Sequence, residues 1–219
     1  MPRLGVLIAL CALLASAPAR AGHLAPTSNG AAVIRELNLA RQHPEFYANI
    51  LEAQRGHYRE KLFVLPSGAL RRTKEGVAGL DEAIRFLRHA QPRNALRASA
   101  GISLATVEHV ADQAGGGFGH GGSDRSNPAM RMNRHGTWSI YWGENVSYGK
   151  STAREIVTAL IIDDGLRGRK HRANIFNPTF NYAGAAIGPH ARYRTVCSID
   201  FAGGYAERTA AASPLLARN

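Results

Sequence analysis

Three side chains that could carry out acid–base or metal chemistry stand in segments rich in glycine or turn residues. They are His120 in GFGHGG, Glu144 in WGENV and His171 in GRKHRANIF. Small neighbours leave a side chain uncovered, and two imidazoles with one carboxylate suit a divalent metal or proton transfer. Their separations of 24 and 27 residues match no local metal motif. A shared site would therefore have to be assembled by the fold.

Two acidic residues, Asp163 and Asp164, stand at the end of an apolar helical segment, a few residues before His171. Acidic groups at a helix C-terminus oppose the helix dipole and need a compensating partner. Two hypotheses stay open. The basic residues between 167 and 172 could compensate both acids, or one aspartate could join the histidines as a fourth polar group.

Ordinary structural roles are also open for the three candidates. A loop histidine, an arginine-paired glutamate and a carbonyl-bonded histidine would look the same in the sequence. No G-x-S-x-G motif is present, and Ser123 is the one candidate nucleophile beside the proposed site. We expect surface or structural roles for the other histidines: His23, His43, His57, His89, His109, His135 and His190.

The spacing of apolar residues predicts several of the helices that must position these residues. Val33, Leu37 and Ala40 recur at helical intervals, and Thr152 with Glu155 forms a capping box before a strongly apolar segment. The predicted helices cover 30–42, 44–54, 79–89, about 99–114 and the segment after Thr152. Residues 56–75 are mixed and basic and give no clear prediction.

Strand patterns dominate the second half of the chain. Alternation from Trp138 to Tyr148 predicts a strand interrupted at Gly143, after a loop over 119–136 with one helical turn at 128–133. Residues 182–187 and 193–201 predict a hairpin. Its second strand would place these residues on one face: Tyr193, Thr195, Cys197, Ile199 and Phe201. Helices followed by strands with one helix between them predict an α+β fold.

The N-terminal segment and the composition indicate the cellular location of the protein. Residues 1–21 combine Arg3, a short apolar run and Ala19-Arg20-Ala21, which predicts a secretory signal peptide and a secreted or periplasmic protein. No later segment is apolar enough to predict a membrane span. We expect a flexible lead-in at 22–29, one domain over 30–203 and a loose tail at 204–219. Cys197 alone would remain after cleavage, so no intramolecular disulfide is expected.

The chain is basic, with a formal net charge of +11. Such a charge draws an exported protein toward anionic envelope polymers or lipid headgroups. The basic residues are scattered and lack a stacking pattern, so specific nucleic-acid binding is not expected. The oligomeric state is not indicated.

Several segments together resemble the CAP domain of cysteine-rich secretory, antigen 5 and pathogenesis-related proteins (the SCP-like extracellular domain), in a bacterial, disulfide-poor form. The similarity covers about residues 30–203. The most specific part is GEN followed by HRANIF, after the histidine-containing loop GHGGSDRSNPAMRMNRHG. The resemblance implies a three-layer α-β-α sandwich with a central antiparallel sheet and a large cleft.

In that family the cleft holds two histidines and two acidic residues, and several members bind a divalent metal there, often zinc. The matching positions here are His120, Glu144 and His171, with Asp163 or Asp164 in place of a family glutamate. The resemblance further implies that Arg172 and Asn174 bond the loop to the sheet. The aspartate side chain is shorter than that of the family glutamate, so it would have to lie closer to a metal or bind it through water.

Family membership leaves three functions open. The favoured hypothesis is a non-enzymatic secreted binding module whose cleft takes a metal and a small apolar, lipid or envelope-derived ligand. The second is a metal-dependent hydrolase with Glu144 as its base. The third is a protein held at the envelope by its charge.

Overall fold

The structure is a computed structural model that describes residues 28–208. The expected signal peptide and residues 22–27 and 209–219 lie outside the described residues. Within that range the central sheet has the strand order β4-β6-β7-β5. The strands are β4 (Arg97–Ala98), β5 (Gly136–Tyr148), β6 (Tyr182–His190) and β7 (Arg194–Glu207).

The predicted antiparallel sheet is confirmed for the three long strands, because β7 pairs antiparallel with both β6 and β5. The two-residue strand β4 pairs parallel with β6, so the complete sheet is mixed. Strand β5 lies at one edge of the sheet. This edge carries Glu144, and the side chains of both neighbouring helical layers reach it.

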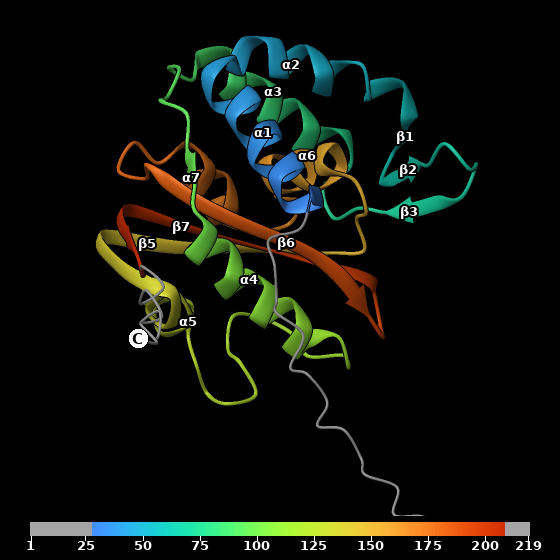
Figure 1. Ribbon diagram of the computed structural model, residues 1–219. Coiled ribbons are helices and arrows are strands. Elements are labelled where there is room, and N and C mark those ends of the chain that lie inside the picture. The colour runs from blue at the N-terminus through green and yellow to red at the C-terminus, as the bar shows by residue number, and fades with distance from the viewer. Residues whose placement is uncertain (1–27, 209–219) are drawn as a thin grey trace, which may run out of the picture.

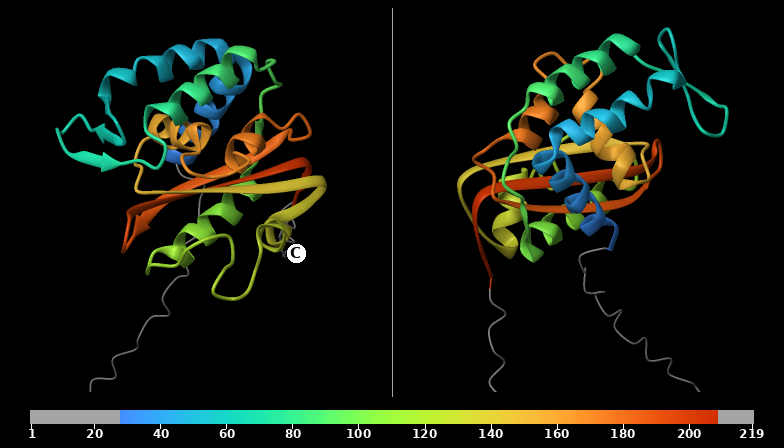
Figure 2. Two further views of the ribbon diagram at one scale, coloured as in Figure 1. Left: turned by 180° about the vertical axis from the view of Figure 1, so that it is seen from behind. Right: turned by 90° about the horizontal axis from the view of Figure 1, so that it is seen from above.

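Helices cover both faces of this sheet, as Figures 1 and 2 show. One face carries five helices: α1 (Ser28–Gln42), α2 (Pro44–Glu52), α3 (Val77–His89), α6 (Ala153–Ile162) and α7 (Lys170–Phe176). The other face carries α4 (Ala100–Gln113) and α5 (Pro128–His135). The α+β, three-layer α-β-α prediction is therefore confirmed.

The alternation of β7 divides the core between the two faces. Cys197, Ile199 and Phe201 are completely buried against the five-helix layer, as the hairpin pattern predicted. Val196 and Ala202 point the other way and pack toward α4 and α5. Successive side chains leave opposite faces of a strand, so one sequence supplies two cores.

Helix α4 lies unusually close to the sheet because β6 has a glycine beneath it. A Cβ at Gly184 would collide with the backbone nitrogen of Ser103 on α4. The start of α4 is fixed by Ser99, whose hydroxyl accepts a hydrogen bond from the Ile102 amide. The capping box of Thr152 and Glu155 at α6 is confirmed.

Three predicted boundaries differ from the structure. Strand β5 is continuous through Gly143, and its irregularity lies between Ser139 and Trp142, where Ile140 has a positive φ of 73°. Strand β7 continues to Glu207, so residues 204–207 belong to the sheet and not to a tail. Residues 28 and 29 begin α1 and are not a flexible lead-in. In the last two cases pairing or helix formation extends beyond the local sequence signal.

The segment 56–75, which gave no clear prediction, contains most of a short 3-10 turn (Arg55–His57) and a small antiparallel sheet. Its strands are β1 (Tyr58–Arg59), β2 (Leu62–Val64) and β3 (Leu70–Arg72). Figure 1 shows this sheet beside the five-helix layer. Among residues 28–208, no helix is long and apolar enough to cross a membrane.

Candidate functional site

Glu144 is the centre of a buried polar cluster on the face of the sheet that α4 and α5 cover. Its side chain is only 1% exposed. The carboxylate lies 2.7 Å from Nδ1 of His120 and accepts hydrogen bonds from Arg131 at 2.8 Å and Ser198 at 3.0 Å. Both oxygens of this carboxylate are therefore engaged by the protein itself.

The charges around Glu144 decide its protonation. Burial raises the pKa of Glu144, but the hydrogen bond from His120 and the charges of His109 and Arg131 outweigh burial, and the pKa is lowered overall. His109 is completely buried, with Nε2 3.8 Å from the Glu144 carboxylate. Burial lowers the pKa of His109. Arg131 thus supplies the permanent positive charge of the cluster.

Asp200 faces Glu144 directly across the β5–β7 ladder and is fully buried. Neither of its carboxyl oxygens accepts a hydrogen bond from an N–H group or a hydroxyl among residues 28–208. Burial, followed by the negative charge of Glu144, raises the pKa of Asp200 well above its ordinary value. Two adjacent buried carboxyls cannot both ionise cheaply. The pair therefore holds one proton, on Asp200, while Glu144 stays ionised.

This proton makes a testable contribution to the pH dependence of stability. The folded protein keeps the proton on Asp200 at pH values where an unfolded aspartate, with a pKa of about 3.9, has released it. Stability from this group therefore falls as pH rises above about 4 through the folded pKa. We expect Asp200→Asn to raise Tm relative to the unmodified protein, and to raise it more at pH 7 than at pH 4.

Calorimetry at both pH values measures this difference. The exposed variant Glu45→Gln is the control and should show no comparable increase between pH 4 and pH 7, because the Glu45 side chain is 81% exposed. An Asp200→Asn shift of equal size at both pH values would contradict a proton held on Asp200.

His120 is held at the surface end of this cluster. Its side chain is 57% exposed, and its hydrogen bond with Glu144 raises the pKa of the imidazole. The loop before it is tied down because the Gly119 amide donates to the Tyr148 hydroxyl at 2.8 Å and the Gly119 carbonyl accepts from Gln113 at 2.6 Å. Arg131 also donates to the His120 carbonyl at 3.2 Å. The ring is therefore presented by a fixed loop.

An aromatic cluster adjoins His120. Phe118 is 70% exposed and stacks on Tyr148 with ring centroids 4.7 Å apart. Tyr193 packs against Tyr148 at 5.2 Å. The exposed face of Phe118 gives this region an apolar contact surface two residues from the imidazole.

His171 forms a second histidine–carboxylate pair. Its Nδ1 lies 2.7 Å from Asp163, and its backbone amide donates to the same carboxylate at 3.0 Å. Asp163 ends α6 in the left-handed conformation, which directs it back toward the start of α7. Asp163 is therefore paired with His171. That an aspartate joins both histidines as a fourth polar group of one site stays a prediction.

Asp164 has a different role, since its carboxylate accepts from the backbone amides of Lys74 and Glu75 at 2.6 and 2.8 Å. Arg169 donates a hydrogen bond to Glu75 at 2.7 Å, and Arg172 donates one to Glu82 at 2.8 Å. Neither guanidinium bonds the carboxylate of Asp163 or Asp164. The basic residues therefore tie α7 to the start of α3 and to its first turns.

The two histidine pairs are connected through the edge strand β5. Asn145 donates to the His171 carbonyl at 3.0 Å, and Asn174 donates to Asn145 at 2.9 Å and to the Glu144 carbonyl at 3.3 Å. Glu144 and Asn145 are consecutive on a strand, so their side chains leave opposite faces. His120 is bound on the α4/α5 face, and His171 is held on the α7 face of the same strand.

The predicted role of Asn174 in bonding the loop to the sheet is therefore confirmed. The same prediction is wrong for Arg172, which donates to the Ile161 carbonyl of α6 and to Glu82 of α3. It joins α7 to other helices and not to the sheet. The candidate nucleophile Ser123 hydrogen-bonds Asp112 through its hydroxyl and its amide.

Within residues 28–208, no group of three or more His, Cys, Asp and Glu side chains is arranged to hold a metal ion. The three-ligand set of His120, Glu144 and His171 is therefore not formed by these side chains. Each imidazole has its Nδ1 on a carboxylate, which directs Nε2 away from that carboxylate, an arrangement common in metal-binding histidines. Zinc binding by the two imidazoles stays a prediction.

Most of the buried partners carry no clear signal in the sequence. His109 looks like an ordinary helix residue, and nothing local singles out Arg131, Gln113 or Ser198. Asp200 does carry a signal, because it is a lone acid within an otherwise apolar strand, CSIDFAG. Buried acids need a partner or a proton, so this position could have been marked as unusual.

Comparison with known proteins agrees with this architecture. Residues 82–201, more than half of the chain, match the CAP family, described as the cysteine-rich secretory protein family. The chain belongs to this family. No curated protein matches the sequence.

The solved structures that match are distant in sequence and have TM-scores below 0.5. They include an outer surface protein from Borrelia burgdorferi, with 14% identity, a TM-score of 0.42, and coverage of 50% of this chain and 78% of that one. An extracellular protein containing an SCP domain from Bacillus anthracis has 17% identity, a TM-score of 0.40, and coverage of 55% and 37%. A cysteine-rich secretory protein from Staphylococcus aureus has 12% identity, a TM-score of 0.36, and coverage of 58% and 38%. The match spans under two fifths of the last two chains.

Proposed function

We propose that this protein is an exported, non-enzymatic binding module of the CAP family. Its ligand would meet the imidazoles of His120 and His171 at the edge strand β5, beside the exposed ring of Phe118. The observation that carries this proposal is that both carboxylate oxygens of the buried Glu144 already have partners in the protein. These partners are His120, Arg131 and Ser198.

A general base needs a carboxylate that can reach a water molecule and take its proton. Glu144 is 1% exposed, its pKa is lowered, and its oxygens are already occupied. The hydroxyl of Ser123 bonds Asp112 and no histidine. These features support a carboxylate that orients a ring and oppose the alternative of a hydrolase with Glu144 as its base.

Both histidines are held through Nδ1, by Glu144 and Asp163 respectively. Each Nε2 is then the nitrogen left to meet a ligand. We propose a divalent cation such as zinc, or a small envelope-derived molecule with an apolar part that rests on Phe118. The proposal requires the two rings to face one ligand across the β5 edge. The basic charge and the predicted signal peptide support action in the envelope or outside the cell.

The test is a zinc titration by calorimetry of the mature protein, together with native mass spectrometry of the purified protein for any ligand it carries. We expect zinc binding that weakens at least about tenfold in His120→Ala and in His171→Ala. His89→Ala is the matched control, because His89 is exposed and its Nδ1 lies against the Arg85 carbonyl. It should bind zinc like the unmodified protein.

Absence of both zinc binding and a co-purifying ligand would contradict the proposal, as would equal zinc affinity in all three variants. Casein and ester hydrolysis is measured in parallel. Hydrolysis that disappears in Glu144→Gln would favour the metal-dependent hydrolase instead.

A further inference from the structure

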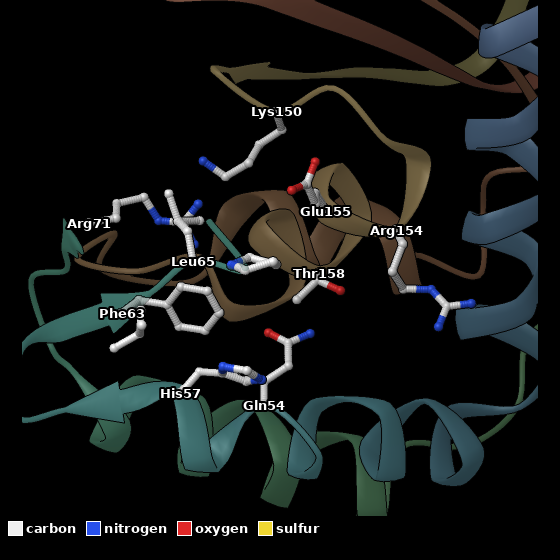
Figure 3. Close-up of a pocket in the computed structure, with 11 residues that line it drawn as sticks. Gln54, His57, Phe63, Leu65, Arg71, Lys150, Arg154, Glu155 and Thr158 are labelled. Carbon is white, nitrogen blue, oxygen red and sulfur yellow. The ribbon is translucent and has the colours of Figure 1, made fainter. Parts of the chain in front are cut away.

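A second concave site, separate from the histidine pairs, lies between the small β1–β3 sheet and α6. Its cavity has a volume of about 210 Å³. This volume is below the range of drug-sized pockets, roughly 300–1,000 Å³, so it suits a small molecule. One wall comes from residues 54–71 and the other from Lys150 and the first turns of α6. Figure 3 shows the side chains that surround it.

Two cations that form no salt bridge within the described residues border this cavity. Lys150 and Arg71 are half-buried, and neither side chain forms a hydrogen bond or an ion pair with a protein group anywhere in residues 28–208. In Figure 3 the Lys150 side chain extends toward Arg71. Burial, and then the charge of Arg71, lowers the pKa of Lys150, while the charge of Glu155 acts in the opposite direction.

The carboxylate in the lining, Glu155, interacts with Lys150 electrostatically but forms no salt bridge with either cation. It accepts from the backbone amides of Ser151 and Thr152 at 3.3 and 3.2 Å and completes the cap of α6. Arg154 also lines the cavity, but it is paired with Glu36. The cavity therefore has an excess of positive charge on the side of Lys150 and Arg71.

The rest of the wall near Arg71 is apolar. Phe63, Val64, Leu65 and Pro66 line the cavity, and the Arg71 guanidinium lies over the Phe63 ring at 4.9 Å. On the side opposite Lys150 in Figure 3, Gln54 and His57 point inward. Their side chains make no hydrogen bond within residues 28–208 and can reach a polar part of a ligand.

We infer that this cavity binds a small amphipathic anion, a carboxylate or monophosphate on a short apolar arm. The anionic group would lie between Lys150 and Arg71, where charge-assisted hydrogen bonds replace the missing partner. The arm would lie against Phe63 and Leu65. The lining calls for both an anionic group and an apolar arm. An anion without an apolar arm would leave the apolar wall uncovered, and a neutral molecule would leave both cations without a salt-bridge partner.

This site differs from the one in the proposed function. It uses none of the histidines or carboxylates of that site, and its 54–71 wall precedes the segment 82–201 that matches the CAP family. The inference therefore does not depend on the proposed function, and the two can fail independently.

The test is calorimetric titration of the mature protein with octanoate, octyl phosphate, octan-1-ol and inorganic phosphate. We expect octanoate or octyl phosphate to bind, and octan-1-ol and inorganic phosphate to bind at least about tenfold more weakly. Lys150→Gln and Arg71→Gln should each weaken binding of the amphipathic anion about tenfold, because each removes a charge-assisted contact. The two anionic probes distinguish a carboxylate from a phosphate source.

Arg72→Gln is the matched control, because Arg72 neighbours Arg71 on β3 but is exposed and does not line this cavity. It removes the same charge and should leave binding unchanged. Leu65→Glu, which places a negative charge in the cavity, should abolish binding while thermal unfolding shows a folded protein. No binding of either anion, equal binding of octan-1-ol or inorganic phosphate, or equal losses in Arg72→Gln and Arg71→Gln would each overturn the inference.

Discussion

Replacing Arg131 with methionine is expected to lower the free energy of unfolding by about 3–5 kcal/mol at pH 7. The guanidinium is 2% exposed and donates to Glu144 at 2.8 Å and to the carbonyls of His120 and Ser126 at 3.2 Å each. Its removal leaves the ionised Glu144 buried beside Asp200 without a permanent positive charge. Urea denaturation at pH 7 measures the loss.

Two further variants show whether the charge or the packing is responsible. Arg134→Met on the same helix removes surface ion pairs with Glu108 and Asp124 and should cost less than about 1 kcal/mol. The double variant Arg131→Met, Glu144→Gln should be more stable than Arg131→Met alone, because no buried negative charge is then left uncompensated. An Arg131→Met protein within about 1 kcal/mol of the unmodified one would contradict this view of the cluster.

Arg41→Met is expected to cost about 3–4 kcal/mol for a different reason. Arg41 is completely buried and forms no ion pair with a carboxylate among residues 28–208. It donates to four backbone carbonyls, those of Asn94, Ile175, Asn177 and Phe180, at 2.6 to 3.2 Å. Each buried carbonyl left without a donor costs about 1–3 kcal/mol. The side chain joins α1 to the segments before β4 and after α7.

Burial and the neighbouring charge of Arg93 lower the pKa of Arg41 to about 10, so it is still charged at pH 7. Arg41→Lys keeps the charge but not the planar set of donors, and should recover only part of the loss. Arg35→Met, an exposed position on the same helix, should change stability by less than about 0.5 kcal/mol. Chemical denaturation of the three variants checks the order. Equal stability of Arg41→Met and Arg35→Met would exclude the proposed bridging role.

The charged groups of the site are also buried and depend on one another. Arg131 donates a hydrogen bond to Glu144, and Asp200 lies opposite Glu144 on the neighbouring strand. These contacts keep Glu144 ionised and Asp200 protonated. His120 and His171 are oriented by carboxylates that are themselves held in place, one by hydrogen bonds from Arg131 and Ser198 and one by the left-handed end of α6. A binding surface on such anchored rings needs little rearrangement when a ligand arrives.

Local patterns in the sequence were sufficient for most of the helices and for the capping box of α6. The segment 44–54 forms Pro44–Glu52, and the capping box at Thr152 is present, because these signals act over one or two turns. Strand ends were less predictable. Gly203 and Gly204 look like a breaker in isolation, yet pairing of β7 with β5 carries the strand on to Glu207.

The amino-acid sequence by itself determined the layered α+β architecture. Apolar residues alternate along the strands and recur at helical intervals along the helices, and this spacing indicates which face of each element is buried. It also marked His120, Glu144 and His171 by their unusual neighbours. Only the tertiary structure decided the partner of each charge: Arg131 and Asp200 for Glu144, and Asp163 but not Asp164 for His171. Strand register and helix packing bring together groups such as Glu144 and Ser198, which are 54 residues apart, and no local pattern encodes that distance.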